Sequence, residues 1–209
     1  MISIIYTKYT LFKGEHRYQK EHNLGRKLLR YGLEKYYGLV FTNEELEDQI
    51  DRNEYGKPFL SGYPKIHFNV SHCEGWVVCA FSEGKIGVDV ERIQNFPAVM
   101  VKKILTKQER QMLGRYKKNT EDYQRTFYRF WTWKESYLKW KGGGFYMDPL
   151  CVEFTLDKIS SFPCCSDKKS AFFEKMLDTD CMLSVCFDKE EKGGMVYELY
   201  KEKMAGFSS

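Results

Sequence analysis

The sequence lacks the segments that would place a protein in or across a membrane. No run approaches the ~18 apolar residues needed to span a bilayer. Residues 1–8 alternate like a strand and lack the charged region and apolar stretch of a signal peptide. We therefore expect a cytoplasmic protein with no membrane partner.

Cysteine pairs of the CxxC kind are also absent. The seven cysteines lie at positions 73, 79, 151, 164, 165, 181 and 186 and form no regular framework. An odd number of scattered thiols in a chain of 209 residues fits a reducing compartment better than secretion. The pattern gives no indication of a zinc site.

Basic runs of the kind that mark a nucleic-acid surface are missing, and so is the GxxxxGK[ST] loop of many nucleotide phosphotransferases. We expect no nucleic-acid partner. Lys plus Arg total 33 against 29 for Asp plus Glu, and the net charge of +4 suits an anionic ligand. The hydrophobic share of 43% and the charged share of 30% are typical of a globular protein.

Two long amphipathic helices are predicted among short strands. After a polar stretch to about residue 20, apolar residues recur at helical spacing from Leu24 to Tyr37, and Gly38 is a stop signal. A second helix covers residues 123–141 and is ended by Gly142-Gly143-Gly144. A capping box at Thr106 and Glu109 starts a shorter helix. Strands are predicted at 2–7, 66–71, 76–81, 86–91, 151–156, 171–176, 181–187 and 195–200, and the tail from Met204 is expected to fray.

This order predicts an α+β fold built from two similar halves, residues 1–84 and 85–209. Each half would pack a long helix on a mostly antiparallel sheet, so that the halves form a pseudo-dimer. An active-site cleft is expected between them, since ligand sites tend to occur at such interfaces.

One strand and one helix carry charged residues in a pattern that suggests chemistry. In the strand 86–91, the two-residue period sends Asp89 and Glu91 to one face. In the second helix, Glu135 and Lys139 stack one turn apart. Three carboxylates suit Mg²⁺, which prefers hard oxygen ligands, and a lysine suits a phosphate. Alternatively, the strand shows a solvated face, and the helix carries an ordinary surface ion pair.

Four ordered motifs resemble the signature of the 4'-phosphopantetheinyl transferases of the surfactin-synthetase type. Ile86-Gly87-Val88-Asp89 and Trp131-Thr132-Trp133-Lys134-Glu135-Ser136-Tyr137-Leu138-Lys139 fill every position of its strand and helix motifs. Tyr55-Gly56-Lys57-Pro58 and Phe68-Asn69-Val70-Ser71-His72 look like the same family. The resemblance covers residues 55–145 and is weaker before residue 24 and after about residue 155.

The resemblance implies a monomeric enzyme that transfers the 4'-phosphopantetheine arm of coenzyme A to a serine of an apo acyl or peptidyl carrier protein. The reaction needs Mg²⁺ and releases adenosine 3',5'-bisphosphate. By the family pattern, Asp89, Glu91 and Glu135 bind the metal. Lys139 contacts the pyrophosphate and can protonate the leaving group. The serine's proton goes to Glu135 or to a metal-bound water, and Lys134 either contacts phosphate or has a structural or solvent-facing role.

The resemblance also implies a coenzyme A site in the first half. It places Ser71 and His72 at the 3'-phosphate, and Gly56-Lys57-Pro58 beside the adenine and the phosphates. Relatives commonly have an arginine shortly before the Leu-Gly that opens the first long helix, whereas Glu21 stands there in this chain. The candidates left for that contact are Arg17, Lys20 and His22.

The identity of the carrier protein is not visible in the sequence. Basic residues between 94 and 120 are expected to form its docking surface; they include Lys102, Lys103, Lys107, Arg110 and Arg115. An alternative is a non-catalytic module of the same fold that binds coenzyme A or carrier domains. The combination of Asp89, Glu91, Glu135 and Lys139 argues against it, because a pure binder needs no metal site.

Overall fold

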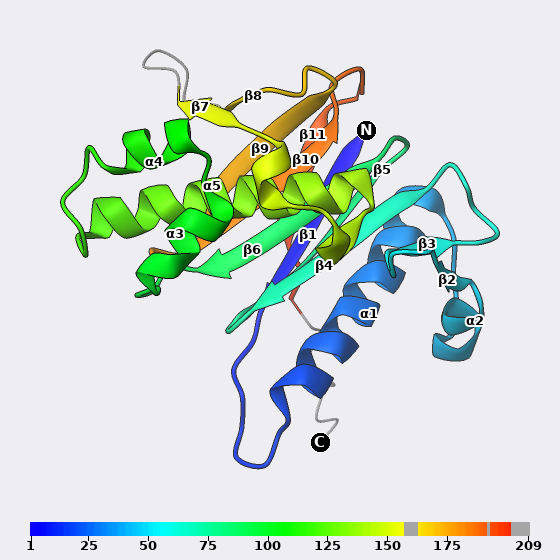
Figure 1. Cartoon of the computed structure of the whole chain (residues 1–209). Coiled ribbons are helices and arrows are strands. Elements are labelled where there is room, and N and C mark those ends of the chain that lie inside the picture. Colours follow the sequence, from blue (N-terminus) through cyan, green and yellow to red (C-terminus); the bar gives the residue numbers. More distant parts are fainter. Residues whose placement is uncertain (157–162, 192, 202–209) are drawn as a thin grey trace.

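The protein has the mixed α+β fold expected from its sequence, as seen in a computed structural model that describes residues 1–156, 163–191 and 193–201 (Figure 1). Within these ranges, the larger sheets have the strand orders β11-β1-β5-β4 and β6-β10-β9. The first sheet comprises β1 (Ile2–Lys8), β4 (His67–Cys73), β5 (Trp76–Ser82) and β11 (Met195–Leu199). The second comprises β6 (Ile86–Arg92), β9 (Ser170–Leu177) and β10 (Cys181–Asp188).

Strand β11 crosses from the second half of the sequence into the first sheet. It runs parallel to β1, whereas the other neighbouring strands of both sheets are antiparallel. Just beyond it, the Tyr200 N–H donates to the Tyr6 carbonyl at 2.8 Å. The last described strand therefore covers one edge of a sheet whose other strands come from the first half.

A 21-residue helix packs on each large sheet. Helix α1 (Arg17–Tyr37) lies against β5 and β1, and helix α5 (Glu121–Lys141) lies against β6 and β10. Both end at a glycine in the left-handed conformation, Gly38 with φ 66° and Gly142 with φ 83°. These glycines terminate the helices as the sequence predicts, because a residue with a side chain is strained at such angles.

Shorter elements flank the two long helices. Helix α2 (Asn43–Asp48) and the hairpin β2 (Ile50–Arg52) and β3 (Pro58–Leu60) follow α1. Helices α3 (Ala98–Ile104) and α4 (Lys107–Leu113) precede α5, and η1 (Gly144–Tyr146), η2 (Pro149–Cys151), β7 (Phe154–Leu156) and β8 (Pro163–Cys165) follow it. The predicted capping box opens α4, since Thr106 accepts from the Glu109 N–H and Glu109 accepts from the Thr106 N–H.

Two side chains join the sheets where β4 lies beside β6. Asn69 Oδ1 accepts the Val88 N–H at 2.9 Å, and Ser71 Oγ accepts the Val90 N–H at 3.3 Å. These side-chain oxygens take the place of the backbone carbonyls that would pair with the strand in a continuous sheet. The junction therefore fixes β6 on both sides of Asp89.

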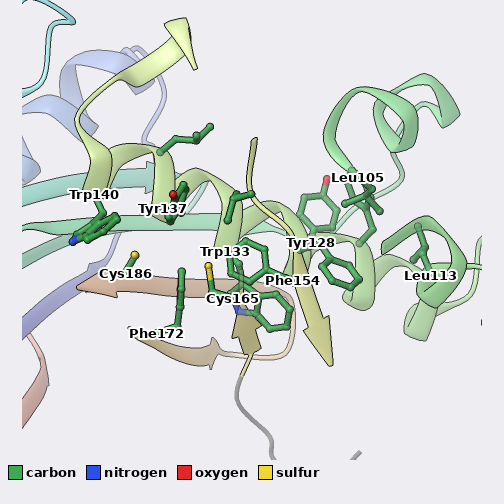
Figure 2. Packing of buried hydrophobic residues seen from close by; sticks show 14 of the residues in the cluster. Leu105, Leu113, Tyr128, Trp133, Tyr137, Trp140, Phe154, Cys165, Phe172 and Cys186 are labelled. Atoms are coloured by element: carbon green, nitrogen blue, oxygen red, sulfur yellow. The ribbon is translucent and has the colours of Figure 1, made fainter. Parts of the chain in front are cut away.

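An aromatic core holds α5 against the second sheet (Figure 2). Trp133 is fully buried, and its ring centroid lies 5.6 Å from that of Phe154, which in turn lies 5.1 Å from Phe172. Burying a large apolar side chain contributes roughly 1.5–3 kcal/mol. This packing anchors the helix that carries Glu135 and Lys139.

Helix α1 begins at Arg17, within the polar stretch that precedes the periodic apolar residues, and Arg17 Nε and Glu21 form an ion pair of 2.8 Å across its first turn. One local prediction is wrong. Residues 151–153 are not a strand, since Asp148 caps the 3₁₀ turn η2 and β7 starts only at Phe154. The tail predicted to fray from Met204 lies outside the described residues. Within the described ranges, no helix is long and apolar enough to cross a membrane.

Candidate functional site

Strand β6 turns two carboxylates to one face. Val88 and Val90 are buried in the core on the other face, as the strand period predicts. Asp89 is only 3% exposed, and its Oδ2 atom is buried without a hydrogen-bond partner in the described part of the chain. An unpaired buried carboxylate oxygen is costly. Asp89 is therefore suited to bind a cation.

Gly87 allows α5 to lie directly on β6. A Cβ at this position would come within 2.1 Å of the Ser136 carbonyl oxygen and 2.3 Å of the Trp140 nitrogen. Only glycine avoids that overlap, so the strand motif needs Gly87 for packing. The close contact brings Lys139 and Glu135 to the acidic face of β6.

Lys139 meets Asp89 and Ser71 at this point. Its Nζ donates to Asp89 Oδ1 at 2.7 Å and to Ser71 Oγ at 3.1 Å, while Ser71 Oγ donates to the same Asp89 oxygen at 3.1 Å. The structure thus brings together residues from β4, β6 and α5. Ser71, assigned to a phosphate by the resemblance, has its hydroxyl engaged by Asp89, Lys139 and Val90.

Glu91 and Glu135 complete an acidic cluster around Asp89. Burial raises the pKa of Glu91 to about 8, and the charges of Asp89 and Glu135 add to the rise. The pKa of Glu135 is raised by burial and then by Asp89. Lys139 opposes both shifts. Three crowded carboxylates with one ammonium leave negative charge uncompensated, which favours binding of a cation.

These donors fit a hard divalent cation by their chemistry, since all are carboxylate oxygens and one is buried without a partner. Across the described ranges, no group of three or more His, Cys, Asp or Glu side chains is already arranged as a metal site. Lys139 instead occupies Asp89 Oδ1. A cation at this cluster would therefore require the carboxylates to turn toward it.

The Tyr55-Gly56-Lys57-Pro58 motif forms a turn against the end of α5. Lys57 Nζ donates to the Ile86 carbonyl at 2.8 Å and to the Lys139 carbonyl at 2.6 Å, and burial lowers its pKa to about 8. Gly56 has φ 84°, and Pro58 begins β3. A pocket of about 160 Å³ lies here, with Gly56, Lys57, Glu135 and Lys139 among its lining residues.

His72 lies next to Ser71 and contacts Glu21. The His72 Nδ1 atom is 3.0 Å from Glu21 Oε2, and Glu21 also accepts from Arg17 Nε at 2.8 Å and from the Tyr9 hydroxyl. Burial lowers the pKa of His72, although the Glu21 charge opposes the shift. Glu21, which stands where an arginine was expected, is thus the centre of a polar network.

Lys134 has a structural role. It is fully buried, forms an ion pair of 3.0 Å with Glu109, and donates to the carbonyls of Pro149 and Val152 at 2.8 and 2.7 Å. Glu109 in turn accepts from the Phe154 N–H at 2.8 Å. The pair ties α4 and η2 to α5, on the side of the helix away from Asp89.

Sequence reasoning missed several residues that position this site. Asn53 binds the N–H groups of Tyr55 and Lys57 and donates to the Gly142 carbonyl at 3.0 Å, and Asn69 joins the sheets. Asn53 opens an Asn-x-x-Gly turn, which is a readable signal. Asn69 stands in the Phe68-Asn69-Val70-Ser71-His72 motif, but no local pattern indicates its distant partner Val88, nor the partner Glu21 of Tyr9.

Comparisons with known proteins agree with the motifs. Residues 85–188 match the model of the 4'-phosphopantetheinyl transferase superfamily. The chain is 34% identical to 4'-phosphopantetheinyl transferase Sfp of Bacillus subtilis over 58% of its length and 51% of the relative. It is 36% identical to gsp of Aneurinibacillus migulanus over 63% and 54%, and 31% identical to HetI of Nostoc over 62% and 54%. The chain spans about half the length of the curated relatives it matches.

Proposed function

Because the chain belongs to the 4'-phosphopantetheinyl transferase superfamily, we propose that it transfers the 4'-phosphopantetheine arm of coenzyme A to a serine of an apo carrier protein. The serine oxygen would bond to the β-phosphorus, and adenosine 3',5'-bisphosphate would leave. The proposal rests on one observation. Lys139 is hydrogen-bonded to Ser71 and Asp89, beside the carboxylates of Glu91 and Glu135.

Asp89, Glu91 and Glu135 are the residues proposed to hold Mg²⁺. The partnerless oxygen of Asp89 supports this assignment, and so does the crowding of the two glutamates, whose pKa values are raised by burial and by the Asp89 charge, since a cation would relieve that repulsion. When bound, Mg²⁺ supplies Lewis-acid stabilisation of the charge on the pyrophosphate.

Lys139 is proposed to stabilise the leaving group. Its ammonium already lies at the centre of the cluster, where it can neutralise charge on the departing phosphate and donate a proton to it. Glu135, on the same helix face, is proposed to accept the proton of the attacking serine. Burial and the Asp89 charge raise its pKa, which makes this carboxylate a better proton acceptor than an exposed glutamate.

We propose that coenzyme A binds to those residues of the site that come from the first half of the chain. Gly56, Lys57 and Lys139 line one pocket, and Pro58 follows directly in the chain, which supports a place for the adenine and phosphates there. His72 remains the proposed contact of the 3'-phosphate. Ser71 belongs to the same proposed set, and its hydroxyl also holds Asp89 and Lys139 in place.

The division into two halves at residues 84 and 85, with the active-site cleft between them, is part of the proposal. One long helix on each sheet and the β4–β6 junction support it. Strand β11 would belong structurally to the first half. A monomeric, cytoplasmic protein completes the proposal, and the free thiols of all seven cysteines are in keeping with a reducing compartment.

The transfer is tested by mass spectrometry of apo carrier proteins after incubation with coenzyme A and Mg²⁺. A carrier that gains one phosphopantetheine arm supports the enzyme. A non-catalytic binding module is the competing function, and Glu135→Gln separates the two. Transfer by the wild type and its loss in Glu135→Gln are expected of an enzyme, whereas a binding module transfers nothing in either form.

A further inference from the structure

A buried carboxylate joins three segments at the edge of the site. Glu21 is 3% exposed, and its partners are Arg17 on the same helix, Tyr9 after β1, and His72 on β4. Burial, together with the contact to Glu21, raises the pKa of Tyr9 to about 12, so the phenol stays protonated and donates. Figure 1 shows the first turns of α1 next to the end of β4.

Two of these partners interact electrostatically with the acidic cluster. The Arg17 charge lowers the pKa of Glu91, and the charges of Lys139 and Asp89 act on the pKa of His72 in opposite directions. His72 uses Nδ1 for Glu21, which leaves Nε2, on the opposite edge of the ring, without a partner in the described residues. Arg17 uses Nε for Glu21, its Nη1 atom lies 3.8 Å from Glu74 Oε2, and its side chain is 46% exposed. Arg17 can therefore donate to an anion through its remaining N–H groups, and His72 can do so through Nε2 when its imidazole is protonated.

The other candidate cations lie elsewhere. Lys20 forms an ion pair of 3.0 Å with Glu15, and the ring of His22 stacks on Tyr18 at 6.2 Å. Both line a separate depression together with Arg26. Arg17 is thus the one candidate of the three that shares a carboxylate with His72.

We propose that Glu21 is a positioning residue that holds Arg17 and His72 as a paired binding site for the 3'-phosphate of coenzyme A. This inference rests on the proposed function. Arg17, one turn earlier in α1, takes the place of the arginine that is missing at position 21. Glu21 fixes the direction of both donors and stabilises the imidazolium, whose Nε2–H then donates to the phosphate.

The contribution of this subsite to binding can be measured separately from that of the rest of the ligand site. A nucleotide with a 3'-phosphate gains the Arg17 and His72 contacts, and a nucleotide without it does not. Calorimetric binding of adenosine 3',5'-bisphosphate and adenosine 5'-monophosphate therefore isolates the subsite without any need for turnover. The variants are Glu21→Gln and Arg17→Gln. Glu15→Gln is the matched control, because the Glu15 carboxylate pairs with Lys20 and accepts the Phe12 N–H but contacts none of Glu21, Arg17 and His72 in the described residues.

We expect the wild type to bind the bisphosphate at least about ten-fold more tightly, in line with charge-assisted hydrogen bonds. Glu21→Gln and Arg17→Gln should each bring this ratio to about two or less, with the affinity for the monophosphate unchanged. Their combination should do little more than either alone, because the residues act as one unit. Glu15→Gln should keep the wild-type ratio.

The inference is overturned if Glu21→Gln weakens both nucleotides equally, which would mean a general structural role. It is also overturned if the ratio is unchanged or rises, which would mean that Glu21 merely neutralises Arg17. The unchanged monophosphate affinity reports on folding, and Arg17→Gln, at a half-exposed position, provides a second test if Glu21→Gln does not fold. A wild type that shows the preference but modifies no carrier would reject the proposed transfer and retain the subsite.

Discussion

Gly87 and Ser136 lie so close that a Cβ on Gly87 would come within 2.1 Å of the Ser136 carbonyl oxygen. This contact sets the distance between α5 and β6. Since Asp89 follows Gly87 by two residues and Lys139 follows Ser136 by three, the same contact determines whether Lys139 Nζ reaches Asp89 at 2.7 Å. Packing and chemistry therefore depend on one glycine.

Gly87→Ala should force α5 away from β6. Overpacking of this kind costs about 1–3 kcal/mol, and in a chain of this size each kcal/mol lowers the Tm by roughly 2–4 °C. We expect a lower Tm in calorimetry and a lower transfer rate. Gly194→Ala is the control, because a Cβ there meets nothing within 4 Å. Equal stability of both variants would show that the helix contact does not constrain the site.

Glu91→Gln should stabilise the protein in the absence of divalent cations. The pKa of Glu91 is raised to about 8, so the folded state holds a proton that the unfolded state has lost above its ordinary value of 4.5. Wild-type stability should therefore fall as the pH rises from about 5 to 8, and the substitution should remove that part of the fall. Melting curves across this range, each compared with Glu91→Gln, measure the difference.

Mg²⁺ should offset the loss of stability that the wild type shows as the pH rises. Added Mg²⁺ is expected to raise the Tm of the wild type more at pH 8 than at pH 6, because ionised carboxylates bind it better. In Glu91→Gln the rise should be smaller. If the Mg²⁺-dependent rise is the same in both proteins, Glu91 is not a ligand.

Lys134 and Lys139 should fail in different ways when changed to methionine. Lys134→Met leaves Glu109 buried without its partner, and breaking such a pair costs about 3–5 kcal/mol, so the Tm should drop sharply. Lys139→Met should largely keep the fold but lower kcat by about 10²-fold or more, as expected for a group that stabilises transition-state charge. Melting curves and turnover of the folded fraction distinguish them. A folded Lys134→Met enzyme with lost turnover would contradict this assignment.

Charge reversal on α3 should weaken the carrier protein's binding. Lys102 and Lys103 are exposed at the end of the molecule where α3 and α4 flank α5 (Figure 1), whereas Arg110 is partly engaged by the Leu105 carbonyl. Lys103→Glu is expected to raise the carrier KM about three-fold or more with little change in the KM for coenzyme A. The control is Lys65→Glu, an exposed lysine between β3 and β4. Equal carrier KM values in both variants would remove α3 from the docking surface.

Local periodicity was enough to predict part of this arrangement. The strand period placed Asp89 and Glu91 on one face, and the helix period placed Glu135 and Lys139 one turn apart; the predicted helix stops at Gly38 and Gly142 are confirmed. These features follow from residues that are neighbours in the sequence.

Contacts between segments that are distant in the sequence could not be predicted from it. Lys134 is buried because Glu109 and the Pro149 carbonyl meet it, and neither is encoded in its own helix. Glu21 is buried because Tyr9 and His72 satisfy its charge, which no spacing in α1 reveals. The parallel pairing of β11 with β1 joins residues more than 190 positions apart.

Transfer of the phosphopantetheine arm can be measured directly. Apo acyl and peptidyl carrier proteins are incubated with coenzyme A and the protein, with Mg²⁺ or with a chelator, and both the carrier mass and released adenosine 3',5'-bisphosphate are followed. We expect at least one carrier to gain one phosphopantetheine arm for each bisphosphate released, only with Mg²⁺, and not with Asp89→Asn. No mass gain across the panel, or equal transfer by Asp89→Asn, would contradict this expectation.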